Sequence, residues 1–503
     1  MLKLLRLLFN PGAYLDHNAS TPVHELVQRQ MNNILQNVYG NASSLHTQGR
    51  ISRGHIEESR KTIASILKCN PENIYFTSGG TEANNTALKG TFFKKTGKHL
   101  ITGKIEHESI LGAAGQIEEM GHSVTYLPAT SYGRVNPEEI AANIRAETCL
   151  ISIMHANNET GIIQPVREIS EIARSRNIPL HIDAVQSFGK IPVHVNELGC
   201  DFLTVSSHKI QGPKGCGLLY SSGRYSWTPL IFGGEQEQLL RAGTEGIHQI
   251  AGFALASSIA EKNRQKTFQK LCRLRKVIKY GCRLLFPKLI INESQERWQL
   301  PGTLNLTFPE ISGIRLLAGL DCYGVSVSIG SACTANRIEP SHVLLGMGIS
   351  EELALSSIRV SMGPSTDIID VLFFLWALNQ VLKGDPEGFS FIDPEHLTES
   401  RILSNSTYLI DLRLPHERFF SPSIPGAQNL SHIGFEKYIP GIPLDKEVVL
   451  MCSTGIFSLG AGYRLAKSGH RNVKVLFGGY SAWQGRYPEL LQKLIQKPTA
   501  SHP

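Results

Sequence analysis

Short apolar runs alternate with amphipathic stretches through the first half of the chain. Four compact runs that end in polar or turn residues predict strands: CLISIMH (149–155), IPLHIDA (178–184), DFLTVSS (201–207) and GCGLLYS (215–221). Between the first two, PVREISEIARSRN (165–177) carries apolar residues at helical spacing and predicts a helix. Alternating strands and helices predict a mostly parallel sheet, which binds ligands at the carboxyl ends of its strands.

The pattern changes twice further along the chain. A long helical stretch (252–285) leads into the strand-like TLNLTF (303–308) and a glycine- and serine-rich run, IGSACTANRIEPS (329–341). These features predict a second, smaller lobe. The segment GDPEGFSFIDP (384–394) has the composition of a linker. After it, TYLIDLR, VVLMCST and VKVLFGG predict the strands of a separate α/β unit of about 100 residues.

Composition narrows the classes of function. The net charge is +7 over 503 residues with no long Lys/Arg tract, so no direct nucleic-acid partner is expected. The nine cysteines are scattered, without Cys-x-x-Cys or zinc spacing, which indicates a reducing cytoplasm and no metal site. The start, MLKLLRLLFNPG, is too short and too often interrupted by charge to span a membrane, and a short docking segment is expected instead.

Residues with suitable chemistry follow the predicted strand ends. Lys209, in SSHKIQGPKG (206–215), suits a lysine that forms an imine with an aldehyde cofactor. Asp183 ends IPLHID, where a carboxylate would keep a pyridinium nitrogen protonated. Gln186 is suited to donate to the phenolic oxygen of such a ring, and His107, in KIEHESI, to stack on it and move protons.

A phosphate site is predicted from a second motif. FTSGGTEANN (76–85) is a glycine turn opening a helix, where free backbone N–H groups and the Thr81 hydroxyl suit a phosphate dianion. Ser206 and His208 are placed to add donors. Each feature alone is ordinary, since such turns are usually caps and a single strand-end carboxylate usually belongs to a turn. Their occurrence together and in this order is what indicates a cofactor site.

The chain over about 14–382 resembles the cysteine desulfurases, class V members of the type I pyridoxal-phosphate (PLP) enzymes. The motifs that carry the resemblance are YLDHNAST, NASSLH, FTSGGTEANN, IEHES, MHANNETG, HIDAVQ, SSHKIQGPKG, RAGT, GSACT and SIRVSMG. The resemblance implies the type I PLP-dependent transferase fold, which has a large domain with a mostly parallel sheet and a small α/β domain. It also implies pyridoxal 5'-phosphate as cofactor, L-cysteine as substrate and a homodimer.

The resemblance assigns roles to individual residues. Lys209 is expected to form the imine, His107 to stack on the ring, and Asp183 to pair with the pyridine nitrogen. Further cofactor contacts are expected from Gly80, Thr81, Asn158, Gln186, Ser206, His208 and, across the dimer, Thr244. Arg359 is expected to clamp the substrate carboxylate, with assistance from Asn41.

Cys333 distinguishes a desulfurase from an ordinary aminotransferase. It lies in a run of small residues suited to a mobile loop, although a lone cysteine is more often a buried thiol. The match to the family's GSACT loop favours a nucleophile that takes sulfur from cysteine, leaving alanine and a persulfide on Cys333. The longer loop is similar to that of the family's group I, which exchanges sulfur openly with partner proteins.

The C-terminal unit resembles a single rhodanese domain through 408–430 and 448–483. CSTGIFS (452–458) places Cys452 in a loop whose N–H groups converge at a helix start. Ser453 and Phe457 stand where arginines are frequent in that family, and Ser423 where a histidine is common. The loop lacks cationic side chains for thiosulfate, so Cys452 is expected to receive its sulfur from Cys333.

Five parts are predicted along the chain. They are an N-terminal segment (1–13), the PLP-dependent domain (14–385, with a large domain at about 19–262 and a small domain at about 263–385 plus N-terminal residues), a linker (386–392), the rhodanese-like domain (393–495) and a tail (496–503). Two alternatives stay open. One is selenocysteine lyase or cysteine-sulfinate chemistry on the same scaffold, and the other is a sulfur-delivery scaffold with an inert rhodanese domain. The final sulfur acceptor, in iron–sulfur cluster, thio-cofactor or tRNA biosynthesis, is not specified.

Overall fold

The computed structural model describes residues 12–94, 98–295, 298–330, 333–334 and 337–491, and no side chain between 331 and 338. Its largest unit is built on a seven-stranded sheet. In spatial order the strands are β2 (Ile74–Thr77), β8 (Gly217–Ser221), β7 (Phe202–Ser206), β6 (Leu180–Asp183), β5 (Thr148–Met154), β3 (His99–Gly103) and β4 (Ser123–Leu127). The pairings from β7 through β4 are parallel, whereas β8 is antiparallel to both of its neighbours.

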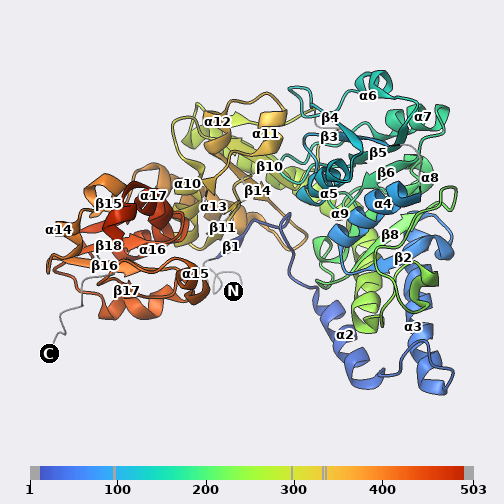
Figure 1. Cartoon of the computed structure of the whole chain (residues 1–503), viewed down its shortest axis with the longest axis horizontal. Helices are drawn as coiled ribbons and strands as arrows, with labels where there is room; N and C mark the ends of the chain where they lie inside the picture. Colours follow the sequence, from blue (N-terminus) through green and yellow to red (C-terminus); the bar gives the residue numbers. More distant parts are fainter. Residues whose placement is uncertain (1–11, 95–97, 296–297, 331–332, 335–336, 492–503) are drawn as a thin grey trace.

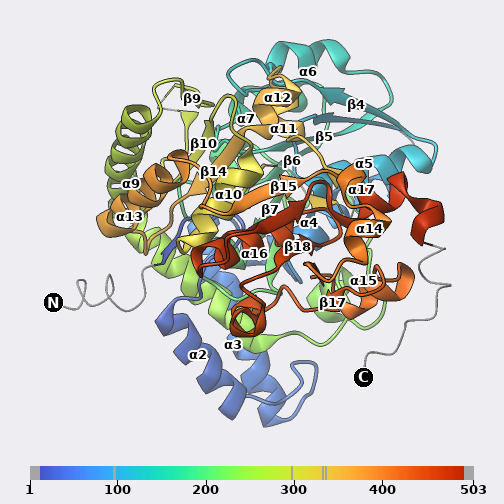
Figure 2. The same cartoon turned by 90° about the vertical axis from the view of Figure 1, so that its left-hand side faces the viewer.

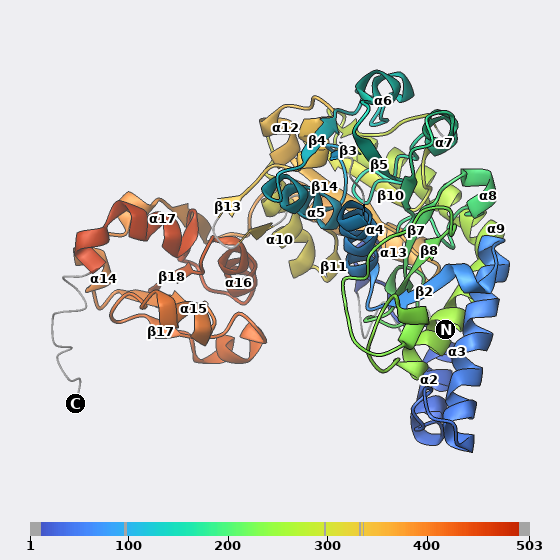
Figure 3. The same cartoon turned by 45° about the vertical axis from the view of Figure 1, so that its right-hand side comes forward.

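Helices cover both faces of this sheet, which explains why its strands read as continuous apolar runs. Along β5, Ile151 and Ile153 belong to the core on one face, while Leu150 belongs to the core on the other. The helices of this unit are α2 (Glu25–Asn37), α3 (Thr47–Leu67), α4 (Gly80–Lys94), α5 (Glu108–Glu119), α6 (Pro137–Asn143), α7 (Val166–Ser175) and α8 (Val195–Leu198), with the 3-10 turns η1 (Pro71–Asn73), η2 (Ser207–Lys209) and η3 (Gln236–Leu239). The pair α2 and α3 projects beyond the sheet (Figures 1 and 3).

The long helix α9 (Ile247–Leu285) joins the first unit to the second. Its first half, around Ile250 and Phe253, packs into the large core, and its second half, around Leu274 and Ile278, packs into the small one. The small unit contains β1 (Ala13–Tyr14), β9 (Ile290–Ile291), β10 (Thr303–Thr307), β11 (Val325–Ser326), β12 (Cys333–Thr334), β13 (Arg337–Ile338) and β14 (Ser357–Ser361), with α10 (Gly313–Cys322), α11 (His342–Gly346), α12 (Glu351–Leu355) and α13 (Ile368–Leu382). Strand β1 pairs with β11, so the start of the described chain lies in this unit.

The C-terminal unit is a separate five-stranded parallel sheet. Its spatial order is β15 (Phe389–Ile392), β19 (Val473–Leu476), β18 (Glu447–Met451), β16 (Thr407–Asp411) and β17 (Gln428–Asn429). The remaining elements are α14 (Glu399–Ile402), α15 (Pro415–Phe420), α16 (Ile456–Lys467) and α17 (Gly479–Arg486), with η5 (Pro394–His396) and η6 (Phe435–Gly441). Figure 2 shows this unit from its outer side, with α16 in front of the small unit.

The C-terminal unit is docked on the small unit through α16 and α10. Ala318 of α10 belongs to the apolar core of the C-terminal unit, and the Cys322 thiol donates to the Gly460 carbonyl oxygen over 3.6 Å. Asp385 accepts from the Arg315 Nε at 2.7 Å and from the Tyr463 hydroxyl. Apolar burial together with paired charges therefore fixes the orientation of the two units (Figure 3).

The segment predicted as a linker, 386–392, differs from that expectation. Its last four residues form β15, an edge strand that pairs in parallel with β19. Glycine and proline near FSFI hide a strand whose first and last residues, Phe389 and Ile392, are buried while Phe391 is exposed. The predicted N-terminal docking segment and C-terminal tail lie outside the described residues, except for the last two positions of the former. Among the described residues, no helix is long and apolar enough to cross a membrane.

A buried ion pair fastens the edge of the large sheet. Arg60 of α3 donates from Nη2 to Glu237 Oε1 over 2.7 Å, and both side chains are at most 6% exposed. Glu237 Oε2 also accepts from the backbone N–H of Phe76 in β2 at 2.7 Å. The pair thus ties a helix, a strand and the η3 turn together.

Arg60→Ala should destabilise the large unit by about 3–5 kcal/mol, because it leaves the Glu237 carboxylate buried without its partner. Chemical unfolding followed by tryptophan fluorescence measures the change. Arg29→Ala is the matched control, since its ion pair with Glu25 is about 70% exposed on both sides and should contribute less than about 1 kcal/mol. Equal effects of the two substitutions would contradict the structural role given to Arg60.

Candidate active site

A cavity of about 300 Å³ opens at the carboxyl ends of the parallel strands. It lies where β5, β6 and β7 end and α4 begins, as expected for a sheet of this type. Its lining includes nine of the residues predicted from the sequence: Gly80, Thr81, His107, Asn158, Asp183, Gln186, Ser206, His208 and Lys209.

Asp183 is held firmly at the end of β6. Its Oδ2 accepts from Asn84 Nδ2 at 2.8 Å, and its Oδ1 accepts from the Val185 backbone N–H at 2.9 Å. The side chain is 6% exposed and lines the cavity. This arrangement fixes a carboxylate where it can hold a proton on a basic ring nitrogen.

His107 caps α5 with its ring and lines the same cavity. Its Nδ1 accepts from the backbone N–H of Ser109 at 3.1 Å, so Nδ1 carries no proton and the neutral ring is protonated at Nε2. Burial lowers the pKa of His107, opposed by the nearby Asp183 carboxylate. The ring is therefore neutral at neutral pH and retains one proton to donate.

The first turn of α4 forms one wall of the cavity. Gly80 and Thr81 begin this 15-residue helix, whose first backbone N–H groups have no helical acceptor. A side chain at position 80 would collide with Val185 at 2.9 Å, so glycine is required for this close approach. Ser206 and His208 line the same cavity. The start of a helix, together with hydroxyl and imidazole donors, is suited to bind a phosphate.

Lys209 ends the 3-10 turn η2 and lines the cavity. Its Nζ donates to the backbone carbonyl oxygens of Asn18 at 2.5 Å and Ala19 at 2.9 Å. Burial lowers the pKa of Lys209 to about 8, with a further lowering from the Arg359 charge and an opposing effect of Asp183 and Asp16. The neutral fraction of this amine near neutral pH is therefore much larger than that of a solvated lysine, which favours its action as a nucleophile.

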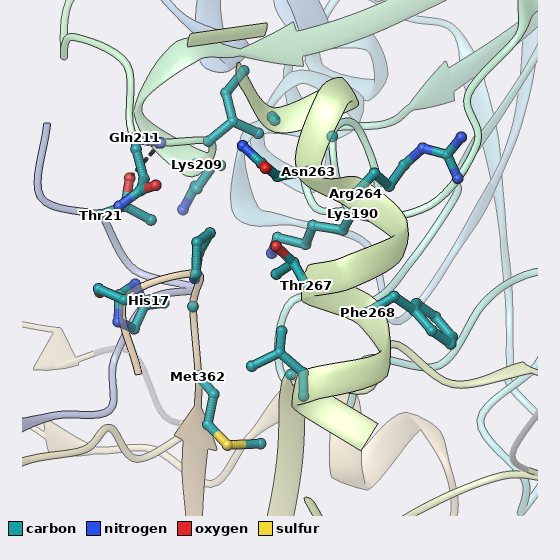
Figure 4. A pocket seen from close by; sticks show the side chains of 18 of the residues that line it. His17, Thr21, Lys190, Lys209, Gln211, Asn263, Arg264, Thr267, Phe268 and Met362 are labelled. Carbon is teal, nitrogen blue, oxygen red and sulfur yellow. Dashed lines mark hydrogen bonds between the residues drawn. The ribbon is translucent and has the colours of Figure 1, made fainter. Parts of the chain in front are cut away.

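Lys209 also lines a second, larger cavity of about 490 Å³ between the large and small units. Figure 4 shows the side chains of Lys190 and Lys209 pointing into it. Lys190 donates to Gln186 Oε1 at 2.9 Å and to Asn18 Oδ1 at 3.2 Å, both neutral oxygens. Burial lowers the pKa of Lys190 to about 7, assisted by the charges of Lys209 and Arg359. We place the chemistry in the smaller cavity, which contains the carboxylate and the imidazole.

Arg359 approaches the smaller cavity from the small unit. Its Nη1 donates to the Asn158 carbonyl oxygen at 3.1 Å, and its Nη2 to Asp16 Oδ1 at 2.7 Å. Among the described residues, its Nε has no hydrogen-bond partner although Arg359 is 6% exposed, and the buried side-chain Oδ1 of Asn158 has none either. Such unsatisfied polar atoms are suited to contacts with a bound molecule.

Two predicted site residues, Thr244 and Asn41, do not line the cavity, and nothing is described of the Cys333 side chain. Thr244 is exposed on the loop after η3, and Asn41 is exposed on the connection between α2 and α3, at the projecting end of that pair (Figure 1). The backbone of Cys333 forms β12 with Ile338 as its partner, and its side chain lies outside the described residues. Figure 3 shows β13 on the side of the small unit that faces the C-terminal unit.

Cys452 lies at the end of β18, in the C-terminal unit. Its Sγ accepts from the Gly455 backbone N–H at 3.1 Å, and the residue is 1% exposed. Ser453 donates to Glu417 Oε1 at 2.6 Å, and Phe457 stacks on His432 with centroids 4.2 Å apart. The thiol is thus contacted by the Gly455 backbone N–H and, at 3.5 Å, by the Ser458 hydroxyl, and the loop presents a carboxylate where an arginine would favour an anionic donor.

Two contributors were not predicted as site residues. Asn84 lies three residues after Thr81, on the same side of α4, and holds Asp183; this helical spacing was the available signal. Lys190 donates to the side chain of Gln186, four residues earlier. Because a lysine after a strand is usually solvated, the sequence around Lys190 does not distinguish it from a surface residue.

The residues of the smaller cavity fit pyridoxal 5'-phosphate. A helix start with hydroxyl donors suits the phosphate, Asp183 the ring nitrogen, and the low-pKa amine of Lys209 the aldehyde. The buried Asn84 Oδ1 and Asn158 Oδ1 lack hydrogen-bond partners in the part of the chain that the structure describes, which leaves polar contacts available for a ligand.

Comparisons with known proteins agree with this fit. The family model described as aminotransferase class-V matches residues 13–374, and the one described as a rhodanese-like domain matches residues 395–486. The cysteine desulfurase IscS of Dictyoglomus turgidum is 41% identical over 372 residues, which are 74% of this chain and 94% of that protein. A mitochondrial cysteine desulfurase of Candida albicans is 40% identical over 373 residues, 73% of this chain and 76% of its own length.

A solved structure extends the comparison to the fold. A NifS-like protein that is 35% identical has a TM-score of 0.69, covering 74% of this chain and 99% of its own. These matches cover about three-quarters of the chain. The assignment of the C-terminal unit therefore rests on the match to the rhodanese-like family model.

Lys190→Met should change how stability depends on pH. An unfolded lysine titrates at about pH 10.4, whereas the pKa of folded Lys190 is about 7. Between these values the unfolded chain binds a proton that the folded chain does not, so the free energy of unfolding rises with pH. The Met variant should therefore show a smaller rise in the midpoint of thermal unfolding across this window.

Lys288→Met is the control, because the Lys288 side chain is 68% exposed. It should keep the pH dependence of the wild type. A Lys190→Met variant with the same rise as the wild type would show that Lys190 is charged in the folded protein.

Proposed function

The chain belongs to the aminotransferase class-V family as a PLP-dependent cysteine desulfurase with a rhodanese-like domain, and we propose that its sulfur passes from Cys333 to Cys452. The observation that carries the assignment of residues is the convergence of Lys209, Asp183 and His107 on one cavity. Its substrate is L-cysteine and its products are L-alanine and protein-bound sulfur.

When bound, pyridoxal phosphate supplies an electron sink for the bonds at the α-carbon of the amino acid. We assign Lys209 to attach the cofactor and to move the α-proton of L-cysteine, since its amine is held with a pKa of about 8. Asp183 keeps the ring nitrogen protonated, and His107 donates and accepts at Nε2. Arg359 binds the substrate carboxylate through its Nε and guanidinium edge.

The sulfur transfers balance without an external oxidant. The Cys333 thiolate attacks the substrate sulfur, so the carbon–sulfur bond of L-cysteine breaks and the sulfur–sulfur bond of a Cys333 persulfide forms. The electron pair of the broken bond stays on the substrate carbon, which takes up a proton on the way to L-alanine. The Cys452 thiolate then attacks the outer sulfur of that persulfide. The sulfur–sulfur bond at Cys333 breaks, one forms at Cys452, and the Cys333 thiolate is restored.

The surroundings of Cys452 favour a persulfide donor over thiosulfate. Backbone N–H groups such as that of Gly455 stabilise a thiolate or persulfide without a cationic side chain. Glu417 lies against the loop through Ser453 and opposes the approach of a dianion. Docking of α16 on α10 keeps Cys452 at a high effective concentration near the small unit that carries Cys333.

We further propose a homodimer, because Thr244 is exposed and does not line the cavity of its own chain. Arg241, beside it, pairs with Glu82 in the first turn of α4 at 3.0 Å, which keeps this loop near the phosphate wall. The acceptor is proposed to be a thiol-bearing protein of iron–sulfur cluster or thio-cofactor synthesis. Cys216, Cys282 and Cys452 of the described region are free thiols, which supports a reducing cytoplasm.

The alternative functions have less support. The Dictyoglomus turgidum and Candida albicans relatives are named cysteine desulfurases, so selenocysteine lyase is not favoured. A catalytically idle scaffold would have no need for a buried amine with a lowered pKa beside a fixed carboxylate.

Lys209→Ala should lower the rate of alanine formation from L-cysteine by at least about a hundredfold, because it removes both the attachment point and the base. Lys214→Ala is the control, since this exposed lysine is five positions away and outside the cavity. Amino-acid analysis of the reaction mixture measures the product. Alanine formed by Lys209→Ala at the wild-type rate would contradict the assignment.

Thr244→Ala should weaken binding of pyridoxal phosphate by about tenfold, the effect of one lost hydrogen bond to a charged group. The protein should sediment as a dimer in both forms. Thr398→Ala, an exposed threonine of the C-terminal unit, should bind the cofactor as the wild type does. A fully active monomer would contradict a site shared between subunits.

A further inference from the structure

Glu159 is a buried carboxylate that the desulfurase mechanism does not use. It follows Asn158 in the turn after β5 and is 3% exposed. Its own backbone N–H donates to Asn157 Oδ1 at 2.8 Å, so the turn itself fixes its position. Burial raises the pKa of Glu159, and the hydrogen bond from Ser341 opposes that shift.

Both ends of the segment that carries Cys333 meet on this carboxylate. Ser341, at the far end, donates from Oγ to Glu159 Oε2 over 2.5 Å and is 2% exposed. At the near end, a Cβ added to Gly330 would lie 2.1 Å from Glu159 Oε2 and 3.0 Å from the Ser341 Cβ. Gly330, Glu159 and Ser341 therefore lie against one another, and a side chain at position 330 would displace the Glu159 carboxylate.

The same two ends are tied to residues of the cavity. Before Gly330, Ser328 pairs with Arg359 through two backbone hydrogen bonds of 2.6 and 3.1 Å. After Ser341, His342 donates from Nε2 to the Glu106 carbonyl oxygen at 2.9 Å, next to His107. The segment thus begins beside the substrate-binding arginine and ends beside the stacking histidine.

We propose that Glu159 is a positioning residue for Cys333, because its carboxylate clamps Gly330 and Ser341 and so fixes both ends of the sulfur-accepting segment next to the substrate. This inference rests on the proposed role of Cys333. Glu159 does not line the cavity assigned to the cofactor. Its loss should slow the step that needs the thiol and leave the steps at the α-carbon unchanged.

The chain offers a matched pair of serines for the test. Ser341 and Ser350 both cap five-residue helices, accepting from the backbone N–H of Leu344 and Leu353 respectively. Only the Ser341 hydroxyl also donates to Glu159. Comparing Ser341→Ala with Ser350→Ala therefore distinguishes the loss of the hydrogen bond to Glu159 from the loss of a helix cap. Ser341→Thr is a further control, because threonine retains the hydroxyl.

Two reactions of the holoenzyme are measured for each variant. Sulfide release from L-cysteine with excess reductant requires the Cys333 thiol. Exchange of the α-proton of L-alanine for deuterium requires the cofactor and Lys209 but no thiol. Amide hydrogen exchange over 342–346, without substrate, reports the attachment of α11 independently of turnover.

Ser341→Ala should lower the kcat for sulfide release about tenfold, as expected for one lost hydrogen bond to a charged group. Its KM and its deuterium exchange should be unchanged, amide exchange over 342–346 should be faster, and Ser341→Thr should restore kcat. Ser350→Ala should match the wild type in both reactions. Unchanged kcat in Ser341→Ala, or an equal loss of both reactions, would overturn the clamp. A wild-type protein that exchanges the α-proton but releases no sulfide would instead refute the proposed function.

Discussion

A parallel sheet covered by helices on both faces leaves only its strand ends for polar chemistry, and the arrangement of the site follows from this constraint. Asp183 ends β6, and Lys209 lies in the turn directly after β7. The apolar cores on either side desolvate the amine and lower its pKa, while Asn84 and Val185 hold the carboxylate in place. The reactive groups are thus fixed at the ends of fully buried strands.

The sequence predicts most of this unit because its strands are short, apolar and bounded by turn residues. It does not predict that β8 runs antiparallel, since an apolar run reads alike in either direction. Strand β15 was hidden because its four residues are flanked by glycine and proline. Sequence motifs identified the residues that line the cavity. The contacts of Lys190 and Glu159 could not be predicted, because they are made with segments that are distant in the sequence. Such long-range contacts, for example the hydrogen bond between Ser341 and Glu159, result from tertiary packing, which the local sequence pattern does not reveal.

The second constraint is the docking of the two sulfur-handling units. Helix α10 precedes the strand that leads to the Cys333 segment, and α16 follows the Cys452 loop, so their contact relates the two cysteines through rigid elements. A flexible tether would give only a statistical proximity, whereas Ala318 buried in the C-terminal core and Asp385 held by Arg315 define one orientation. This geometry favours sulfur delivery within a fixed assembly over capture of a small anion from solution.

The relay is tested most directly by following isotope-labelled sulfur from L-cysteine to the two cysteine peptides by mass spectrometry. In the wild type, labelled persulfide should be found first on Cys333 and then on Cys452. In Cys333→Ser, Cys452 should carry no label, and in Cys452→Ser the label should remain on Cys333. Label on Cys452 in the absence of Cys333 would contradict the relay and make the C-terminal unit an independent sulfurtransferase.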